Sequence, residues 1–212
     1  MDFQYPTSVP LRTQAYTILK EAIISGTLAE NKVIKERQVL EQFRISRTPF
    51  REALQSLETE GWVYTIPYKG AYVSPITDKD ITDMYELRII LETAIARKIQ
   101  SVHATSLNEL GALVTLMELE IATNNDYRFM MLDRDFHLAL YKLSGNSKLM
   151  TVGEQIGDSV RRIGGRILHL PSRKEEVIVE HRSIIDGLAG GDAVDAIVRH
   201  LEAGKRALTP VR

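Results

Sequence analysis

The stretch that decides the fold reads Ser46-Arg47-Thr48-Pro49-Phe50-Arg51-Glu52-Ala53-Leu54. Ser46 is a typical N-cap residue, and a proline is tolerated in the first turn of a helix. Apolar residues then recur at helical spacing as far as Leu57, and Gly61 ends the segment. Arg47 and Arg51 are four residues apart, so they share the face opposite this apolar stripe. The pattern predicts a short helix with one buried face and one exposed cationic face.

The segments around this helix predict a small domain. Helical spacing indicates two earlier helices, at 11–24 and 36–43, with a turn between the second of them and Ser46. Residues 62–66 and 71–73 favour strands, and the four residues Pro67-Tyr68-Lys69-Gly70 favour a turn between them. A helix, a helix-turn-helix and a hairpin, in this order, predict a winged helix-turn-helix domain over residues 1–75.

The rest of the chain reads as helical. After a linker at 74–77, we expect helices at about 78–101, 106–123, 126–144, 147–169, 173–189 and 192–208. The starts are marked by Thr77 with Asp80, by Ser172 with Glu175 (a capping box) and by Asp192 after two glycines. The chain is therefore predicted to be mostly α, with an all-α antiparallel bundle over 76–212.

The composition excludes several classes of protein. Hydrophobic residues make up 44% and charged residues 26% of the 212 residues, as in an ordinary soluble globular protein. The net charge of −1 excludes a histone-like basic protein, and the absence of cysteine excludes thiol nucleophiles, thiolate metal sites and disulfides. The first residues do not resemble a signal peptide, and no apolar run approaches the ~20 residues that span a bilayer. We expect a cytoplasmic protein without a membrane partner.

The predicted helix at Ser46 has the features of a DNA-recognition helix. Residues 35–51 hold five basic and two acidic side chains, a local charge of +3 in a chain of net charge −1. Arginine can bind guanine in the major groove, and the hydroxyls of Ser46 and Thr48 suit phosphate oxygens. Lys69-Gly70 would lie at the tip of the hairpin, where a wing reaches the DNA backbone or the minor groove. The alternative is an ordinary solvated helix face.

Taken in order, these motifs resemble the winged-helix domain of the bacterial GntR family of transcription regulators. The resemblance rests on Glu36-Arg37, on 46–54, on 57–63 and on 70–73. Two departures are small: Leu28-Ala29-Glu30-Asn31 replaces the usual Pro-Gly turn, and Lys69 stands where arginine is commoner. The resemblance implies DNA contacts from Arg37, Ser46, Arg47, Thr48, Arg51 and Gly70.

Three histidines interrupt the apolar stripes of three predicted helices. His137 shares a helix face with Asp133, four residues earlier, and both His181 and His200 point toward the expected core. A buried polar group without a partner costs roughly 1–3 kcal/mol. A shared divalent metal such as zinc, nickel or manganese would remove this cost, and imidazoles with a carboxylate suit such ions. A hydrogen-bonded polar core without a metal explains the pattern equally well. His103 and His169, near helix ends, carry no such prediction.

Arg88 also interrupts an apolar stripe, and a buried arginine needs a carboxylate partner. Glu92, four residues later, is one candidate for this partner. The other is the carboxylate of a small effector molecule. The sequence does not choose between the two.

The second half resembles the all-α ligand domain of the FadR-type branch of the family, the FCD domain. The matching segments are 85–92, 133–137, 180–184 and 199–203. The resemblance implies a homodimer that binds a divalent metal through Asp133, His137, His181 and His200, with an organic acid beside it. The interval from His181 to His200 is about one helical turn shorter than usual, which shifts His200 by about 5 Å along its helix. Three ligands are therefore better supported than four.

These features together predict a homodimeric transcription regulator, a repressor rather than an activator. It would bind a double-stranded DNA operator near the bacterial nucleoid and respond to a small organic acid. One rival is a metal-dependent hydrolase or isomerase on the bundle, since a bound metal can activate water. The sequence shows no general-base constellation, nucleophile motif or phosphate loop for it, so we expect no enzyme. The other rival is a regulator whose bundle is purely structural and free of metal.

Overall fold

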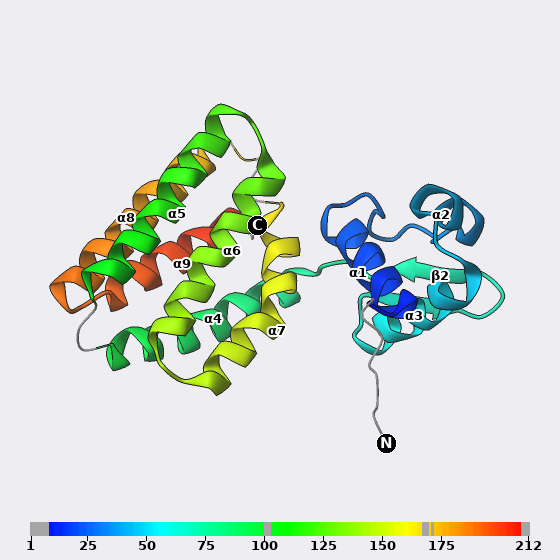
Figure 1. Ribbon diagram of the computed structural model, residues 1–212, viewed down its shortest axis with the longest axis horizontal. Coiled ribbons are helices and arrows are strands. Elements are labelled where there is room, and N and C mark those ends of the chain that lie inside the picture. Colours follow the sequence, from blue (N-terminus) through cyan, green and yellow to red (C-terminus); the bar gives the residue numbers. More distant parts are fainter. Residues whose placement is uncertain (1–8, 100–102, 167–169, 171, 209–212) are drawn as a thin grey trace, which may run out of the picture. The chain divides into compact units, whose positions relative to one another are not determined.

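The computed structural model describes residues 9–99, 103–166, 170 and 172–208. The chain divides into two compact units, Met1–Ile76 and Thr77–Arg212 (Figure 1). His169 lies outside the described residues. Each unit is described by itself.

The first unit is a winged helix-turn-helix, as the sequence predicts. Three helices precede an antiparallel hairpin, and their bounds are α1 Leu11–Ile24, α2 Glu36–Phe43, α3 Arg47–Thr59, β1 Val63–Ile66 and β2 Gly70–Val73. Residues 31–34 pair with the free edge of β2, through Asn31 N to Val73 O (2.9 Å) and Ile34 N to Ala71 O (2.8 Å). The sequence analysis did not predict this extra strand-like segment. It begins at Asn31, whose φ of 60° an asparagine tolerates in place of glycine.

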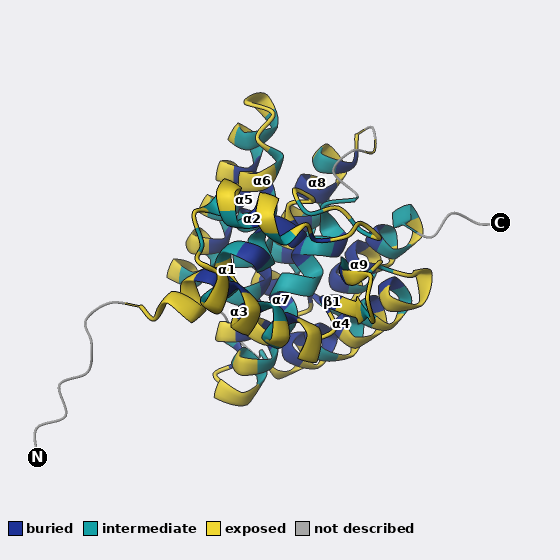
Figure 2. Cartoon of the chain, turned by 90° about the vertical axis from the view of Figure 1, so that its right-hand side faces the viewer, coloured by how far each residue is buried: buried dark blue, intermediate teal, exposed yellow. Residues whose placement is uncertain are grey.

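The core of the first unit lies between α1, α3 and the hairpin. Leu19 and Ile23 of α1 pack in one buried cluster with Phe50 and Leu57 of α3 and with Val73 of β2. The dark blue inner faces and yellow outer faces of the helices show this division (Figure 2). Burial of the apolar stripe therefore fixes which face of α3 remains exposed.

The second unit is an all-α bundle, and the fold class predicted from the sequence is confirmed. Its helices are α4 Asp78–Lys98, α5 Ala104–Ala122, α6 Asp126–Leu143, α7 Ser147–Gly164, α8 Arg173–Gly190 and α9 Val194–Leu208. The main packed pairs are α5 with α6 and α8, α4 with α9, α6 with α7, and α8 with α9. Among the described residues, no helix combines the length and the apolar character needed to cross a membrane.

The helix starts were predicted with mixed success. Thr77 and Asp80 form the expected capping box at α4, and the Asp192 carboxylate accepts a hydrogen bond from Val194 N just before α9. The predicted capping box at Ser172 is wrong. Ser172 has φ 60° and makes no capping hydrogen bond, because this left-handed backbone does not have the extended geometry of an N-cap.

Candidate functional site

The predicted DNA-contacting residues lie on α2, at the start of α3 and at the hairpin turn. Ser46, Arg47, Thr48 and Arg51 are exposed, whereas Phe50, next to Arg51, is buried. Ser46 occupies the N-cap position without making a capping hydrogen bond, so its hydroxyl is not used within the helix. The N-terminal end of α3 thus presents two hydroxyls and two guanidinium groups to solvent.

Arg47 and Arg51 are both paired with one carboxylate, a pairing that the sequence does not predict. Glu36, the first residue of α2, lies 2.8 Å from Arg47 Nε and 3.6 Å from Arg51 Nη2. The arginine side chains remain 71% and 66% exposed, so the pairing leaves them accessible to a DNA groove. Glu36 therefore partly neutralises the cationic face and orients both guanidinium groups.

The wing tip and Arg37 are also exposed. Lys69 and Gly70 follow Tyr68, which has φ 62° and projects fully into solvent. Gly70 has φ 104°, which an L side chain rarely adopts, so the turn depends on this glycine. Arg37 is 91% exposed and bonds Glu41 at 3.0 Å. Arg37 and the wing-tip residues are thus in positions where another molecule can reach them.

In the second unit, three helices bring three buried histidines together. His137 of α6, His181 of α8 and His200 of α9 each offer a ring nitrogen, and these nitrogens all lie within 4.8 Å of one another. The Nε2 atoms of His137 and His200 are 3.2 Å apart. Asp133, one turn before His137, places Oδ1 3.5 Å from His181 Nε2. The structure therefore brings the three histidines together, His200 included, and places the fourth expected position, Asp133, beside His181.

His200 reaches the cluster because α8 and α9 form a tight hairpin. The turn at Asp192 packs directly on Gly187, where a Cβ would lie only 2.7 Å from the Asp192 carbonyl oxygen. His181 lies 11 residues before Asp192 and His200 lies 8 residues after it, and the packing of α8 on α9 brings their ring centroids to 4.7 Å. The short interval between them is thus compatible with a shared site.

Two carboxylates, the buried Glu92 and the half-buried Glu180, hold two of these imidazoles from behind. His137 Nδ1 lies 2.9 Å from Glu92 Oε2, and His200 Nδ1 lies 2.7 Å from Glu180 Oε2. Burial alone would raise the pKa of Glu92, but Arg88 and His137 lower it to about 2. Burial would also raise the pKa of Glu180, but the hydrogen bonds from His200 and Arg173 outweigh this effect and lower the pKa. The sequence does not predict Glu180 as the partner of His200, and it indicates Glu92 only as a partner for Arg88.

Neither nitrogen of His181 is hydrogen-bonded to a carboxylate, although Asp133 Oδ1 lies 3.5 Å from Nε2. His181 is fully buried and stacked on Phe136, with ring centroids 3.9 Å apart, and neither of its nitrogens makes a hydrogen bond. Burial, together with the neighbouring histidines, lowers the pKa of His181 well below its usual range. The ring is therefore neutral near pH 7, and its nitrogen lone pair is available to a cation.

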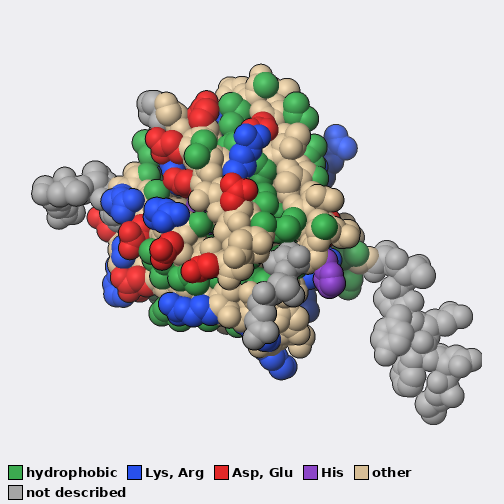
Figure 3. Space-filling model, turned by 90° about the vertical axis from the view of Figure 1, so that its left-hand side faces the viewer, with side chains coloured by type: hydrophobic (Ala, Val, Ile, Leu, Met, Phe, Trp, Pro, Cys, Tyr) green, Lys and Arg blue, Asp and Glu red, His purple; other side chains and the backbone are tan. Residues whose placement is uncertain are grey.

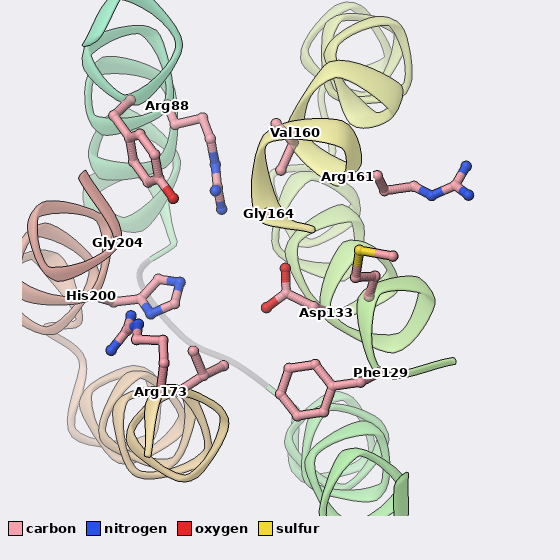
Figure 4. A pocket seen from close by; sticks show the side chains of 12 residues that line it. Arg88, Phe129, Asp133, Val160, Arg161, Gly164, Arg173, His200 and Gly204 are labelled. Carbon is pink, nitrogen blue, oxygen red and sulfur yellow. The ribbon is translucent and has the colours of Figure 1, made fainter. Parts of the chain in front are cut away.

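A cavity of about 50 Å³ adjoins the histidine cluster. Figure 4 shows Arg88 and Asp133 pointing into the space between the helices, with His200 and Arg173 at one side and Arg161 turned away. Arg88 is buried and bonds Glu92 through Nε at 2.9 Å, so the intrachain partner considered for it is present. Its Nη2 has no hydrogen-bond partner, which leaves one buried donor for a bound anion.

A winged helix-turn-helix followed by an all-α bundle is the architecture of a DNA-binding transcription regulator. The chain belongs to the gntR family of bacterial regulatory proteins. Residues 11–73 match the model of that family, and residues 83–203 match the FCD domain. The resemblance proposed from the sequence is thereby confirmed, and the chain is a regulator, not an enzyme.

Individual relatives agree with this assignment. The HTH-type transcriptional regulator YdhC of Bacillus subtilis (strain 168) is 31% identical, over 87% of this chain and 84% of its own. The HTH-type transcriptional repressor RspR of Escherichia coli (strain K12) is 26% identical, over 100% of this chain and 95% of its own. A GntR transcriptional regulator from Rhodococcus sp. RHA1 shares the fold, with a TM-score of 0.78, 23% identity and coverage of 95% and 99% of the two chains.

Proposed function

We propose that the chain is a repressor that binds a double-stranded DNA operator through its first unit. The DNA-binding domain is residues 1–75, with Arg47 and Arg51 reading base edges and Ser46, Thr48, Arg37, Lys69 and Gly70 contacting the backbone. The exposed, cationic start of α3 supports these roles, since recognition helices contact bases with this end. Repression is suggested by RspR, which is similar along the whole chain.

We propose further that residues 76–212 form the effector-binding and dimerisation domain. Two copies would present two recognition helices to the two half-sites of a palindromic operator. Exposed apolar side chains on α4, α5 and α8, such as Ile90, Leu119 and Val179, offer surface for self-association. On the side shown in Figure 3, hydrophobic side chains lie among charged ones of both signs. Size-exclusion chromatography with light scattering measures the molar mass of the protein in solution. A monomer at micromolar concentration would contradict the proposed dimer.

We infer that Asp133, His137, His181 and His200 hold one divalent metal ion. The observation that carries this inference is the unpartnered, buried pair of nitrogens of His181 beside the 3.2 Å approach of the two other Nε2 atoms. Two nitrogens bound to one tetrahedral zinc at about 2.0–2.1 Å lie about 3.3 Å apart. When bound, the ion would supply a positive charge, and an ion that takes more than four ligands, as manganese does, would keep positions open for an effector oxygen.

The proposed effector is a small carboxylate. The buried Arg88 Nη2 lacks a partner and lines the cavity together with Asp133 and His200, so a carboxylate there could contact both the arginine and the metal. The cavity of about 50 Å³ is well below the about 150 Å³ that accommodates benzene in an engineered protein. An acid of a few carbon atoms therefore fits better than a fatty acyl chain.

Effector binding would control transcription by shifting the bundle between two packings that place the two winged helices differently. Coupling free energies between two such sites are typically ~1–3 kcal/mol, which changes operator affinity about 5- to 150-fold.

Thermal unfolding of the full chain with and without added zinc, nickel or manganese tests the metal inference. A ligand that binds only the folded state raises the melting temperature by mass action. We expect this rise in the wild type and in His103→Ala, whose histidine is exposed at the start of α5, and its loss in His137→Ala. An equal rise in His137→Ala would contradict the assignment, as would no rise in the wild type with any of the ions.

A further inference from the structure

Each of two ligand histidines is the end of a chain of three side chains. The first runs from Arg88 Nε to Glu92 Oε1 (2.9 Å) and from Glu92 Oε2 to His137 Nδ1 (2.9 Å). The second runs from Arg173 Nη2 to Glu180 Oε2 (2.7 Å) and from the same oxygen to His200 Nδ1 (2.7 Å). We call these two chains the Glu92 arm and the Glu180 arm. They converge on the histidine cluster from α4 and α8.

The arms determine which nitrogen of each ring carries a proton. A carboxylate bonded to a guanidinium group is ionised and can only accept hydrogen bonds. The Nδ1 atoms of His137 and His200 must therefore be the donors. In a neutral ring the other nitrogen, Nε2, then holds a lone pair and no proton.

The consequence is that two lone pairs face each other across 3.2 Å. Two neutral rings in this state cannot form a hydrogen bond with each other, so the contact is unfavourable in the absence of a cation. His181, whose nitrogens also lack partners, lies beside them, with ring centroids 5.2 Å from His137 and 4.7 Å from His200. The arms thus create a strong local preference for a positive ion.

We propose that Glu92 and Glu180 are positioning residues that hold His137 and His200 as Nδ1–H tautomers and so turn both Nε2 atoms toward one divalent metal ion. This role rests on the metal centre proposed above. Both arms start at an arginine that lines the cavity, so the same carboxylates connect the cavity to the metal site.

Zinc affinity of the full chain, measured by competition with a chromophoric chelator, tests the proposal. Loss of an outer partner of a metal-bound histidine typically costs 10- to 100-fold in affinity. We expect a loss of this size in Glu180→Gln and in Glu92→Gln. The matched control is Glu176→Gln, because Glu176 also lies on α8, bonds Arg173 at 3.0 Å, is 58% exposed and is hydrogen-bonded to no histidine of the described residues. It should bind zinc within about threefold of the wild type.

A second readout does not depend on metal. Two-bond ¹H–¹⁵N spectra of the metal-free chain report the tautomer of each histidine, and we expect Nδ1–H for His137 and His200 in the wild type. Glu180→Gln should convert His200 at least partly to the Nε2–H form, because a glutamine amide can also donate. Glu92 is only 1% exposed, so if Glu92→Gln fails to fold, Glu180→Gln and the spectra carry the test.

The possible failures are distinguishable. A wild type that binds zinc while Glu180→Gln and Glu92→Gln bind it equally well overturns the positioning role alone, as does an Nε2–H tautomer in the metal-free wild type. A wild type that binds no zinc overturns the metal centre and the positioning role together.

Discussion

Arg47 and Arg51 place two positive charges on the same exposed face of α3. Their spacing places them on one exposed face of α3, while Phe50 and Leu57 bury the other face in the core. The sequence predicted the buried and the exposed face of α3, because apolar residues at helical spacing all lie on one side of a helix. It could not predict that Glu36, on another helix, would hold both guanidinium groups.

Removal of either arginine should weaken specific DNA binding without unfolding the domain. Arg47→Ala and Arg51→Ala should each cost ~1–3 kcal/mol in affinity for a duplex selected from a random library, as expected for an arginine that reads a guanine. Fluorescence anisotropy at moderate salt measures this. The control is Arg206→Ala, which removes the same charge from an exposed position on α9. Unchanged affinity in both α3 variants would refute the recognition-helix assignment.

Removal of the Glu36 charge should strengthen non-specific DNA binding, whereas removal of either arginine should weaken specific DNA binding. Glu36→Gln frees both arginines and raises the local positive charge, so a random duplex should bind roughly threefold tighter or more at low salt. The selected duplex should gain less, because the arginines lose their orientation. Glu52→Gln makes the same charge change on α3, and Glu52 is paired with no arginine of the described ranges. Equal gains in the two variants would show that only net charge matters.

The histidine cluster shows the same limit on what the sequence can predict about single residues. Asp133, His137, His181 and His200 stood out because each places a polar group on an apolar helix face. Glu92 could not be assigned to His137, because the two residues are 45 positions apart and only the packing of α4 against α6 brings them together.

At the scale of elements, the α8–α9 hairpin decides whether His200 joins the cluster. The sequence predicted both helices but not their relative height, which depends on close packing of the turn at Asp192 and Ala193 on Gly187. Helix periodicity carries no information about such a contact. The start of α8 was also wrongly predicted, because the residue types at Ser172 and Glu175 do not reveal that the backbone of Ser172 is left-handed.

Gly187→Ala should therefore damage the site from a distance. Its Cβ would meet the backbone of Asp192 at 2.7 Å and of Ala193 at 2.8 Å, so α9 must shift relative to α8. Such overpacking typically costs about 1–3 kcal/mol, and zinc affinity should fall with it. Gly190→Ala, at the end of the same helix with nothing within 4 Å, should be neutral or slightly stabilising. Equal stability and zinc affinity in the two variants would contradict the close-packed hairpin.

At the scale of the whole molecule, the two units should respond differently to acid. Burial lowers the pKa of His181 and of His200 in the folded state, whereas both titrate near 6.5 when unfolded. Below pH 6.5 the unfolded chain thus binds more protons, and the free energy of unfolding falls as the pH falls, by up to about 1.4 kcal/mol per pH unit for each proton. Glu92 and Glu180, whose pKa values are lowered, add a further loss only below about pH 4.5.

Urea unfolding of the chelator-treated chain at pH 7.5 and 5.5 measures this loss. Circular dichroism follows mainly α4–α9, and fluorescence of the chain's single tryptophan, Trp62, follows the winged helix. We expect the midpoint by circular dichroism to fall at pH 5.5 and the Trp62 midpoint to change little. A circular dichroism midpoint that is the same at both pH values would show that the histidines are not buried as neutral rings.

The measurement that tests the central claim most directly is elemental analysis of the tag-free protein purified without chelators. If the proposed metal centre is correct, the protein contains about one divalent metal ion per chain, held by Asp133, His137, His181 and His200. The absence of a stoichiometric metal, even after incubation with zinc, nickel and manganese, would contradict it. The histidine cluster would then be a polar core without a metal, and the DNA-binding assignment would stand alone.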